Sequence, residues 1–202
     1  MICTIIAIDE QDEVLGDFFS ECLQDLENFE NDKTTLSTIK SKALNEAGIS
    51  LSVPADGKFV FLAYSHGSEN ELLASGAIPY VSDTINTTLF RESFFYTCSC
   101  STGMRLGQSL IENKCSSYIG YKGKFEVWDY NRQPFVECAN HGYKLFIQGE
   151  NIESIIIKMK EKYDEHIANY NNDFFGAVIL LANKKALVAL GDFTHCLENI
   201  SS

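Results

Sequence analysis

The chain of 202 residues lacks long apolar runs and is short of basic side chains. No run approaches the length needed to cross a bilayer, so the sequence predicts no transmembrane helix. Sixteen Lys and Arg residues stand against 28 Asp and Glu residues, a formal net charge of −12. Because binding to phosphates needs a basic surface, this composition argues against nucleic acid as a main partner. An acidic surface usually serves solubility, although it is also compatible with a basic substrate or partner.

The sequence also lacks a repeated cysteine spacing and an export signal. Its seven cysteines are scattered, and no second close pair or nearby histidine completes a zinc site around Cys98 and Cys100. No metal or cofactor is therefore expected. The N-terminal residues 1–9 have no basic flank and soon turn acidic, which predicts a first strand instead of a signal peptide. We expect a cytoplasmic protein whose cysteines are mostly reduced and buried.

Apolar strands alternate with amphipathic helices along the whole chain. Strands are predicted at residues 2–8, 59–67, 93–97 and 117–121, and helices at 15–29, 105–113, 134–146 and 152–170. Another helix is predicted from Thr34 or Thr35 to Ala47, with Gly48 as its stop. The alternation is typical of a single α/β domain over residues 1–202, a three-layer α/β/α sandwich with a mostly parallel central sheet.

Three other segments are less regular. Pro54-Ala55-Asp56-Gly57 predicts a turn. Residues 68–92 predict a short hairpin or edge strands and then a short helix around 83–90, with room for one crossover between parallel strands. Residues 177–192 predict either two apolar strands joined by a turn at 183–185, or a helix end followed by a strand.

Two strands end in residues that can carry chemistry. The strand at 59–67 ends in His66-Gly67, and the strand at 93–97 runs into the polar turn Cys98-Ser99-Cys100-Ser101-Thr102-Gly103. If these strands are parallel neighbours, His66 and Cys100 emerge side by side at the rim where sites collect in α/β folds. A cysteine that faces a histidine is the minimum equipment for a thiol nucleophile. His141 lies within a predicted helix and His195 follows the last strand, which makes both weaker candidates, and His166 is expected on the solvated face of an amphipathic helix.

The residues of the two turns suggest separate roles. Cys98 and Cys100 have the same strand parity, but Cys100 lies later, in the polar turn, and is the favoured nucleophile. His66 would be the acid and base. The backbone N–H groups of Gly67 and Cys100 would face the oxyanion, and the start of the following helix would favour the thiolate. Cys98 lies in the last residues of the strand, where a small buried cysteine is ordinary.

A substrate pocket is harder to place. Asp83, Glu126 and Asp129 are acidic and could bind a basic side chain at the P1 position of a substrate. Trp128 and Asp129 could line the same pocket. An aromatic residue in a loop is as often a packing anchor, so Trp128 has both interpretations.

These motifs resemble those of the caspase-like, clan CD cysteine peptidases. Ser99-Cys100-Ser101-Thr102-Gly103 is similar to the Ala-Cys-x-Thr-Gly turn of the CHAT group, and Tyr64-Ser65-His66-Gly67 to its His-Gly turn. Val188-Ala189-Leu190-Gly191-Asp192 is similar to a late strand that ends in Gly-Asp. The resemblance covers residues 59–192 and implies a caspase-like fold and a cysteine endopeptidase with Cys100 as nucleophile and His66 as acid and base.

The sequence departs from the family in two respects. The interval from histidine to cysteine is shorter than in caspases, and the Gln-Ala-Cys-x-Gly form is absent, so a preference for Asp is not implied. The chain has no room for the tetratricopeptide repeats that often accompany CHAT domains, which makes control by a regulatory protein partner plausible. Compact members of the group often cut one protein partner in bacterial defence or cell-death systems, and the resemblance implies such a setting here.

Two other functions are compatible with the same residues. One is a catalytically silent caspase-like module that binds a partner, with His66 and Cys100 too far apart or the pocket filled. The other is a redox protein in which Cys98 and Cys100 form a reversible disulfide, although the Cys-Ser-Cys spacing is tighter than the Cys-x-x-Cys of redox proteins.

Overall fold

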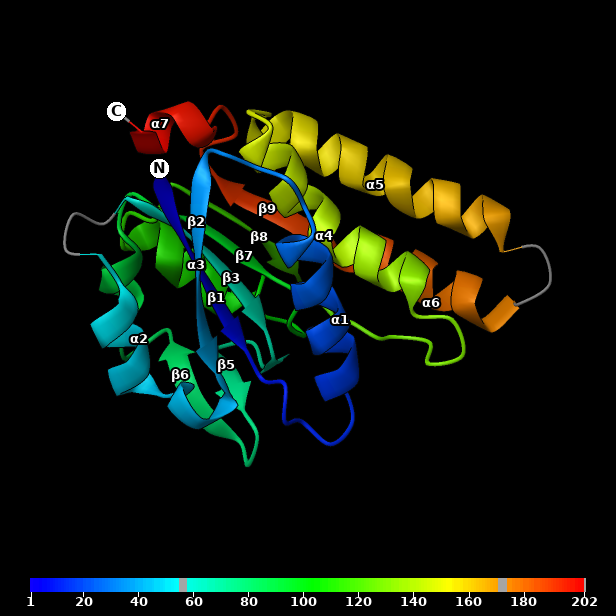
Figure 1. Cartoon of the computed structure of the whole chain (residues 1–202), viewed down its shortest axis with the longest axis horizontal. Coiled ribbons are helices and arrows are strands. Elements are labelled where there is room, and N and C mark those ends of the chain that lie inside the picture. Colours follow the sequence, from blue (N-terminus) through cyan, green and yellow to red (C-terminus); the bar gives the residue numbers. More distant parts are fainter. Residues whose placement is uncertain (55–57, 171–173, 202) are drawn as a thin grey trace.

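A six-stranded sheet forms the centre of the computed structural model, which describes residues 1–54, 58–170 and 174–201 (Figure 1). The strand order is β2-β1-β3-β7-β8-β9, and only the β8–β9 pair is antiparallel. The strands are β1 (Ile2–Ile8), β2 (Thr34–Lys40), β3 (Phe59–Tyr64), β7 (Phe94–Thr97), β8 (Ser117–Tyr121) and β9 (Leu187–Gly191). The prediction of a mostly parallel central sheet is confirmed.

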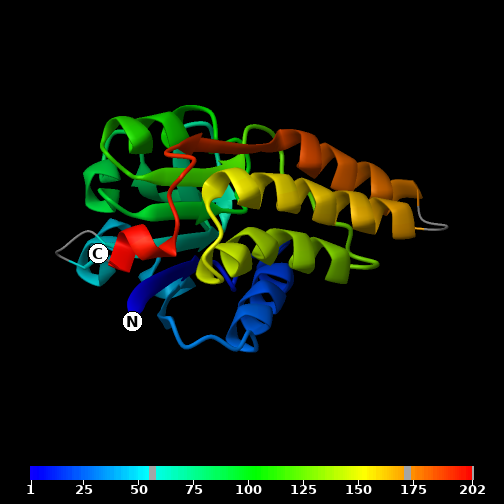
Figure 2. The same cartoon turned by 90° about the horizontal axis from the view of Figure 1, so that it is seen from above.

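Helices cover both faces of this sheet. Because alternate side chains of a strand point to opposite faces, Ile6 and Ile8 join one buried cluster while Ile5 and Ala7 join the other. The first cluster is shared with α1 (Gly16–Glu27), α4 (Gln133–Ile147), α5 (Ile152–Asn169), α6 (Phe174–Ala186) and α7 (Leu197–Ser201), and the second with α2 (Glu46–Ser52) and α3 (Arg105–Glu112). The predicted three-layer α/β/α arrangement is therefore confirmed (Figure 2).

A small second sheet follows β3. It is antiparallel and consists of β4 (His66–Gly67), β5 (Glu71–Ala74) and β6 (Ile78–Ser82). These strands confirm the hairpin predicted within residues 68–92. The helix predicted around residues 83–90 is a single 3-10 turn, η2 (Thr87–Phe90).

The helix predicted over residues 34–47 is wrong. Its first part is β2, whose residues pair in register with β1, and a 3-10 turn follows at η1 (Ser41–Ala43). Threonine and isoleucine are β-branched and favour strands when a partner strand is present, which the spacing of apolar residues does not reveal. Gly48 does not end a helix: its N–H donates to the Asn45 side chain in the first turn of α2.

Residues 177–192 form a helix end followed by a strand, the second of the two predicted alternatives. Residues 177–185 lie within α6, which packs beside α5, and β9 begins directly after it. Phe174, Phe175, Val178 and Leu181 on α6 remain exposed. The α5–α6 pair extends past the sheet at one end of the molecule, and the two chain termini lie at the other (Figures 1 and 2).

Of the predicted turn Pro54-Ala55-Asp56-Gly57, residues 55–57 lie outside the described residues. Among the helices that the structure does describe, none combines the length and the apolar character needed to cross a membrane.

Candidate active site

The pairing of β3 with β7 brings the two predicted turns together. The strands are parallel neighbours, with Ala63 opposite Thr97, and the Cys98 N–H donates to the Ala63 carbonyl at 3.0 Å. His66 and Cys100 each follow this last pair by three residues, in the segments that leave the two strand ends. The expectation that both residues leave the sheet at the same rim therefore agrees with the strand order.

Gly67 shows how closely the two turns approach. A Cβ atom at this position would lie 2.7 Å from Thr102 Cγ2, 2.8 Å from Ser99 Cβ and 2.9 Å from the Cys100 carbonyl oxygen. Real Cβ atoms essentially never show contacts this short. The histidine turn thus packs on the cysteine turn, and only glycine allows that distance.

Asp12 approaches His66 from the segment that follows a third strand. It follows β1, the other neighbour of β3, and its Oδ2 lies 2.9 Å from His66 Nε2. Its Oδ1 accepts the N–H groups of Val14 and Leu15 at 3.0 and 2.7 Å. Burial by itself would raise the pKa of Asp12, but these N–H donors and His66 outweigh burial and lower it. An ionised Asp12 accepts from Nε2–H and leaves Nδ1 of His66 to face a proton donor.

The Cys100 thiol is half-buried and forms hydrogen bonds with the backbone of Phe125. The Phe125 N–H donates to Cys100 Sγ at 3.3 Å, and Sγ lies 3.6 Å from the Phe125 carbonyl oxygen. Among the residues that the structure describes, the thiol and the His66 ring form no hydrogen bond with each other. The two groups therefore belong to adjoining turns, but the thiol is directed at Phe125 in this arrangement.

The cysteine turn is held in an unusual backbone conformation. Ser101 has φ of 58°, in the left-handed region that residues with a side chain rarely adopt. Its N–H donates to the Gly123 carbonyl at 2.8 Å. On the other side, the Tyr118 hydroxyl donates to Thr102 Oγ1 at 2.8 Å. These contacts fix the turn against β8 and the segment that follows β8.

The two backbone groups expected at the oxyanion are free to serve there. Within the described part of the chain, the Cys100 N–H has no acceptor. In the antiparallel pairing of β4 with β5, hydrogen-bonded and non-hydrogen-bonded residue pairs alternate. The Ser68 N–H donates to the Glu71 carbonyl, so the neighbouring pair, Gly67 and Leu72, is a non-hydrogen-bonded one. The Gly67 N–H consequently points away from β5.

The helix α3 contributes less than the sequence predicts. It begins at Arg105, five residues after Cys100, and the N–H groups of Arg105 and Leu106 donate to the Glu69 carbonyl at 3.1 and 2.8 Å. Its first donors are therefore occupied by the hairpin and are not directed at the thiol.

The four residues predicted to line a pocket are not brought together. Asp83 lies 3.6 Å from Arg105 on the face of the sheet that α3 covers. Glu126, Trp128 and Asp129 belong to the segment between β8 and α4, where Trp128 packs against the other core cluster. Asp129 is exposed and paired with Arg132 at 3.2 Å. The structure therefore does not support one acidic pocket built from these residues.

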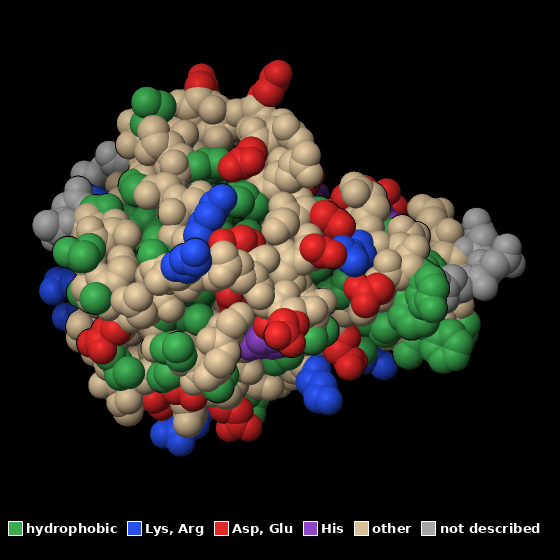
Figure 3. Space-filling model, turned by 60° about the horizontal axis from the view of Figure 1, so that its bottom comes forward, with side chains coloured by type: hydrophobic (Ala, Val, Ile, Leu, Met, Phe, Trp, Pro, Cys, Tyr) green, Lys and Arg blue, Asp and Glu red, His purple; other side chains and the backbone are tan. Residues whose placement is uncertain are grey.

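Trp128 acts as a packing residue. Its ring lies 5.1 Å from that of Tyr130 and 5.8 Å, stacked, from that of Phe175 on α6. This contact ties the segment after β8 to α6. Figure 3 looks toward the end of the molecule where β5 and β6 lie and shows acidic side chains spread over that surface, with hydrophobic side chains gathered at the α5–α6 end.

Cys98 differs sharply from Cys100. It is buried against α4, where its thiol lies 3.5 Å from the Ala139 carbonyl. Burial raises the pKa of the Cys98 thiol far above its usual range, so the thiol stays protonated and unreactive. All seven cysteines are present as thiols and not as disulfides.

Gly191 and Asp192 lie away from the two turns. Because β9 is antiparallel, Gly191 pairs with Ser117 at the start of β8, the opposite end from Cys100. Gly191 has φ of 90°, and the Asp192 N–H donates to the Ser116 carbonyl at 2.9 Å. The Gly-Asp motif therefore ends the edge strand and does not contact the candidate site.

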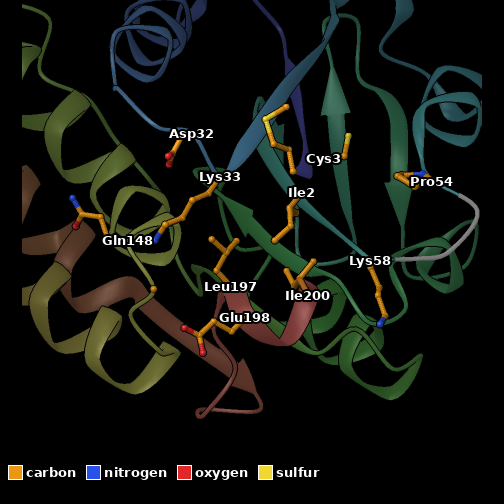
Figure 4. A pocket seen from close by; sticks show the side chains of 12 residues that line it. Ile2, Cys3, Asp32, Lys33, Pro54, Lys58, Gln148, Leu197, Glu198 and Ile200 are labelled. Atoms are coloured by element: carbon orange, nitrogen blue, oxygen red, sulfur yellow. The ribbon is translucent and has the colours of Figure 1, made fainter. Parts of the chain in front are cut away.

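A hollow of about 800 Å³ lies at that same opposite edge (Figure 4). It is lined by Ile2 and Cys3 at the start of β1, Lys58 before β3, and Leu197 and Ile200 of α7, among others. None of the residues that line it belongs to the candidate site.

A comparison of the chain with protein-family models gives no match, and a comparison with curated proteins gives none either. The candidate site therefore rests on its residues and their geometry.

Sequence reasoning missed Asp12 and Asn183. Asp12 lies in the acidic run that follows the first strand, but its place beside His66 depends on β1 being the neighbour of β3. Asn183 lies in the turn of one of the two alternatives predicted for residues 177–192, whereas in the structure it is a fully buried residue of α6 whose side-chain amide forms hydrogen bonds with the backbone of Glu126. No local signal in the sequence identifies either contact.

Proposed function

We propose that this protein is a cysteine endopeptidase that cleaves a protein partner. The observation that carries the proposal is the contact of the His66-Gly67 turn with the Cys100 turn, with Asp12 bonded to His66 at 2.9 Å. A carboxylate, an imidazole and a thiol on adjoining strand ends are the parts of an activated thiol nucleophile. The resemblance of both turns to those of clan CD peptidases of the CHAT group points to the same activity.

Each residue has a distinct role in the proposed reaction. His66 takes the proton of the Cys100 thiol, and the sulfur attacks the substrate carbonyl. The N–H groups of Gly67 and Cys100 donate to the oxyanion that forms. His66 then protonates the leaving amine, and water hydrolyses the thioester to release the acid and restore the thiol. Asp12 orients the ring and stabilises its charged form.

The preference for the P1 residue is left open by the site. The acidic residues suggested by the sequence lie on different faces or are paired with arginine, as Asp83 and Asp129 are. We propose a regulated enzyme with one protein substrate and a regulatory partner, in a bacterial defence or cell-death system. Only the family resemblance supports this setting.

One observation favours the second candidate, a silent module that binds a partner. The Cys100 thiol bonds the Phe125 backbone and not His66, so the base and the nucleophile are not engaged in this arrangement. A module without catalysis would keep this state permanently, whereas a regulated enzyme would leave it on activation.

Hydrolysis of a fluorogenic peptide library with varied P1 residues tests the proposal. Wild type, Cys100→Ala and His66→Ala are compared with Cys98→Ala, which removes a neighbouring thiol that the reaction does not use. We expect loss of cleavage in the first two variants only, with all variants folded by circular dichroism. Cleavage that persists in Cys100→Ala excludes this nucleophile, and a wild type that is inactive even with its partner favours the binding module.

A further inference from the structure

Residues 122–127, called the strap below, lie across the cysteine turn. The Gly123 carbonyl accepts the Ser101 N–H at 2.8 Å, and the Phe125 N–H donates to Cys100 Sγ at 3.3 Å. The strap also begins with a bond from the Lys122 N–H to the Ala186 carbonyl, at the end of α6. It therefore joins the thiol to α6 through a few residues of backbone.

Two anchors hold the strap in place. The Phe125 ring is buried, 4.8 Å from the ring of Tyr121 and 5.9 Å from that of Phe18. Asn183 of α6 is fully buried, accepts the Glu126 N–H at 3.0 Å and donates to the Glu126 carbonyl at 2.7 Å. The Asn183 side-chain amide thus forms hydrogen bonds with both the N–H and the carbonyl of Glu126, as a neighbouring strand would. It thereby fixes the residue next to Phe125.

The strap occupies the thiol, which within the described residues forms hydrogen bonds with Phe125 and none with His66. A general base must lie within hydrogen-bond reach of the proton it removes. In this arrangement the thiol hydrogen faces the Phe125 carbonyl, 3.6 Å from Sγ, and the sulfur already accepts the Phe125 N–H. Attack on a substrate requires that the thiol leave both contacts and turn to His66.

We infer that the strap is an inhibitory latch on Cys100 and that Asn183 is the positioning residue that keeps the latch closed. The inference rests on the proposed function, for which it supplies the means of control. Displacement of α6 breaks the two Asn183–Glu126 bonds, loosens Phe125 and frees the thiol. Signals that reach α6 therefore reach the nucleophile without contact with the substrate.

Alkylation of Cys100 by iodoacetamide, followed by peptide mass spectrometry, tests the latch without any need for peptidase activity. In Asn183→Ala we expect Cys100 to react at least about five-fold faster than in wild type, the change expected from losing one net hydrogen bond. The half-buried Cys196, distant in sequence and held by Asn199, serves as an internal reference whose rate stays constant. Buried cysteines that stay unmodified show that the variant is folded.

Two more variants make the test decisive. Phe125→Ala removes the other anchor of the strap but keeps the backbone N–H group of residue 125. We expect the same acceleration of Cys100 alkylation in this variant, which tests the latch even if Asn183→Ala does not fold. Asn140→Ala is the matched control, because Asn140 is an equally buried amide that bonds Tyr64 and Cys22 instead of the strap. An unchanged or slower Cys100 rate in the strap variants, or an equal rise in Asn140→Ala, overturns the inference.

The two proposals fail in different ways. Faster alkylation without peptide cleavage by any variant supports the latch and rejects the peptidase. Cleavage by wild type with unchanged alkylation in the strap variants supports the peptidase and rejects the latch.

Discussion

Among single residues, Asp12 contributes most to the interpretation of the site. A histidine at a strand end and a half-buried cysteine are common in α/β proteins, and neither has a reason to be reactive by itself. The hydrogen bond between Asp12 and His66 Nε2 changes this, because it fixes the ring, while the other ring nitrogen has no hydrogen-bond partner among the described residues. The two N–H groups that bind Asp12 keep the carboxylate in place and charged.

We predict that Asp12→Asn lowers kcat for peptide cleavage by at least about tenfold with little change in KM, because only the orientation and charge of His66 are affected. Steady-state kinetics on the best library peptide measures both constants. Glu13→Gln, at the exposed neighbouring position, is the control for loss of one negative charge and should behave as wild type. Equal kcat values for Asp12→Asn and wild type would contradict the role of Asp12.

At the scale of elements, the segments after the strands carry both the proposed chemistry and its proposed restraint. The histidine turn, the cysteine turn and the strap meet at the candidate site. At the opposite edge, the segment after β9 is held to β8 by a buried pair, in which Ser117 Oγ lies 2.6 Å from His195 Nδ1. Burial lowers the pKa of His195 to about 4, with only partial opposition from Asp192. This pair has no access to solvent, so its role is structural.

The His195 pair predicts an acid-sensitive fold. Since the folded pKa of about 4 lies below the ordinary value of 6.5, the unfolded chain binds more protons between these values, and stability falls as the pH drops through this window. The linkage gives a loss on the order of 2 kcal/mol between pH 7.5 and pH 5. Urea unfolding at the two pH values measures it. His195→Gln should be less stable at pH 7.5 but should lose this part of the pH dependence; an unaltered pH dependence would exclude His195 as its source.

At the scale of the whole molecule, the packing of the two helical layers determines which thiols can react. Cys22, Cys98, Cys115 and Cys138 are buried within the two core clusters, whereas Cys3, Cys100 and Cys196 are half-buried. Neither composition nor spacing separates these groups. The arrangement also bears on the redox alternative, because Cys98 is packed on α4 and cannot approach an oxidant without opening the core.

We predict that a thiol reagent such as Ellman's reagent modifies at most three cysteines of the native protein and all seven in denaturant, since burial protects the other four. The count should not fall after mild oxidation followed by denaturation. Cys98→Ala serves as the control, with the same native count and one thiol fewer in denaturant. A loss of two thiols on oxidation that Cys98→Ala abolishes would instead support the redox function.

The amino-acid sequence by itself determined the class of the fold and the location of the two turns that form the candidate site. Apolar periodicity and turn residues are local properties, so they predicted most strands and helices and the chemistry at His66, Gly67 and Cys100. They failed at residues 34–47, where pairing with β1 outweighs the helical spacing, and for residues 177–182 they could not separate strand from helix.

The tertiary structure alone decided which residues meet. The order of strands puts β3 between β1 and β7, and this order makes the segments that carry Asp12, His66 and Cys100 neighbours at one rim. The bond between Asn183 and Glu126 likewise joins residues 57 positions apart. Contacts at such separations depend on how the layers pack around the sheet, for which a single sequence carries no local signal.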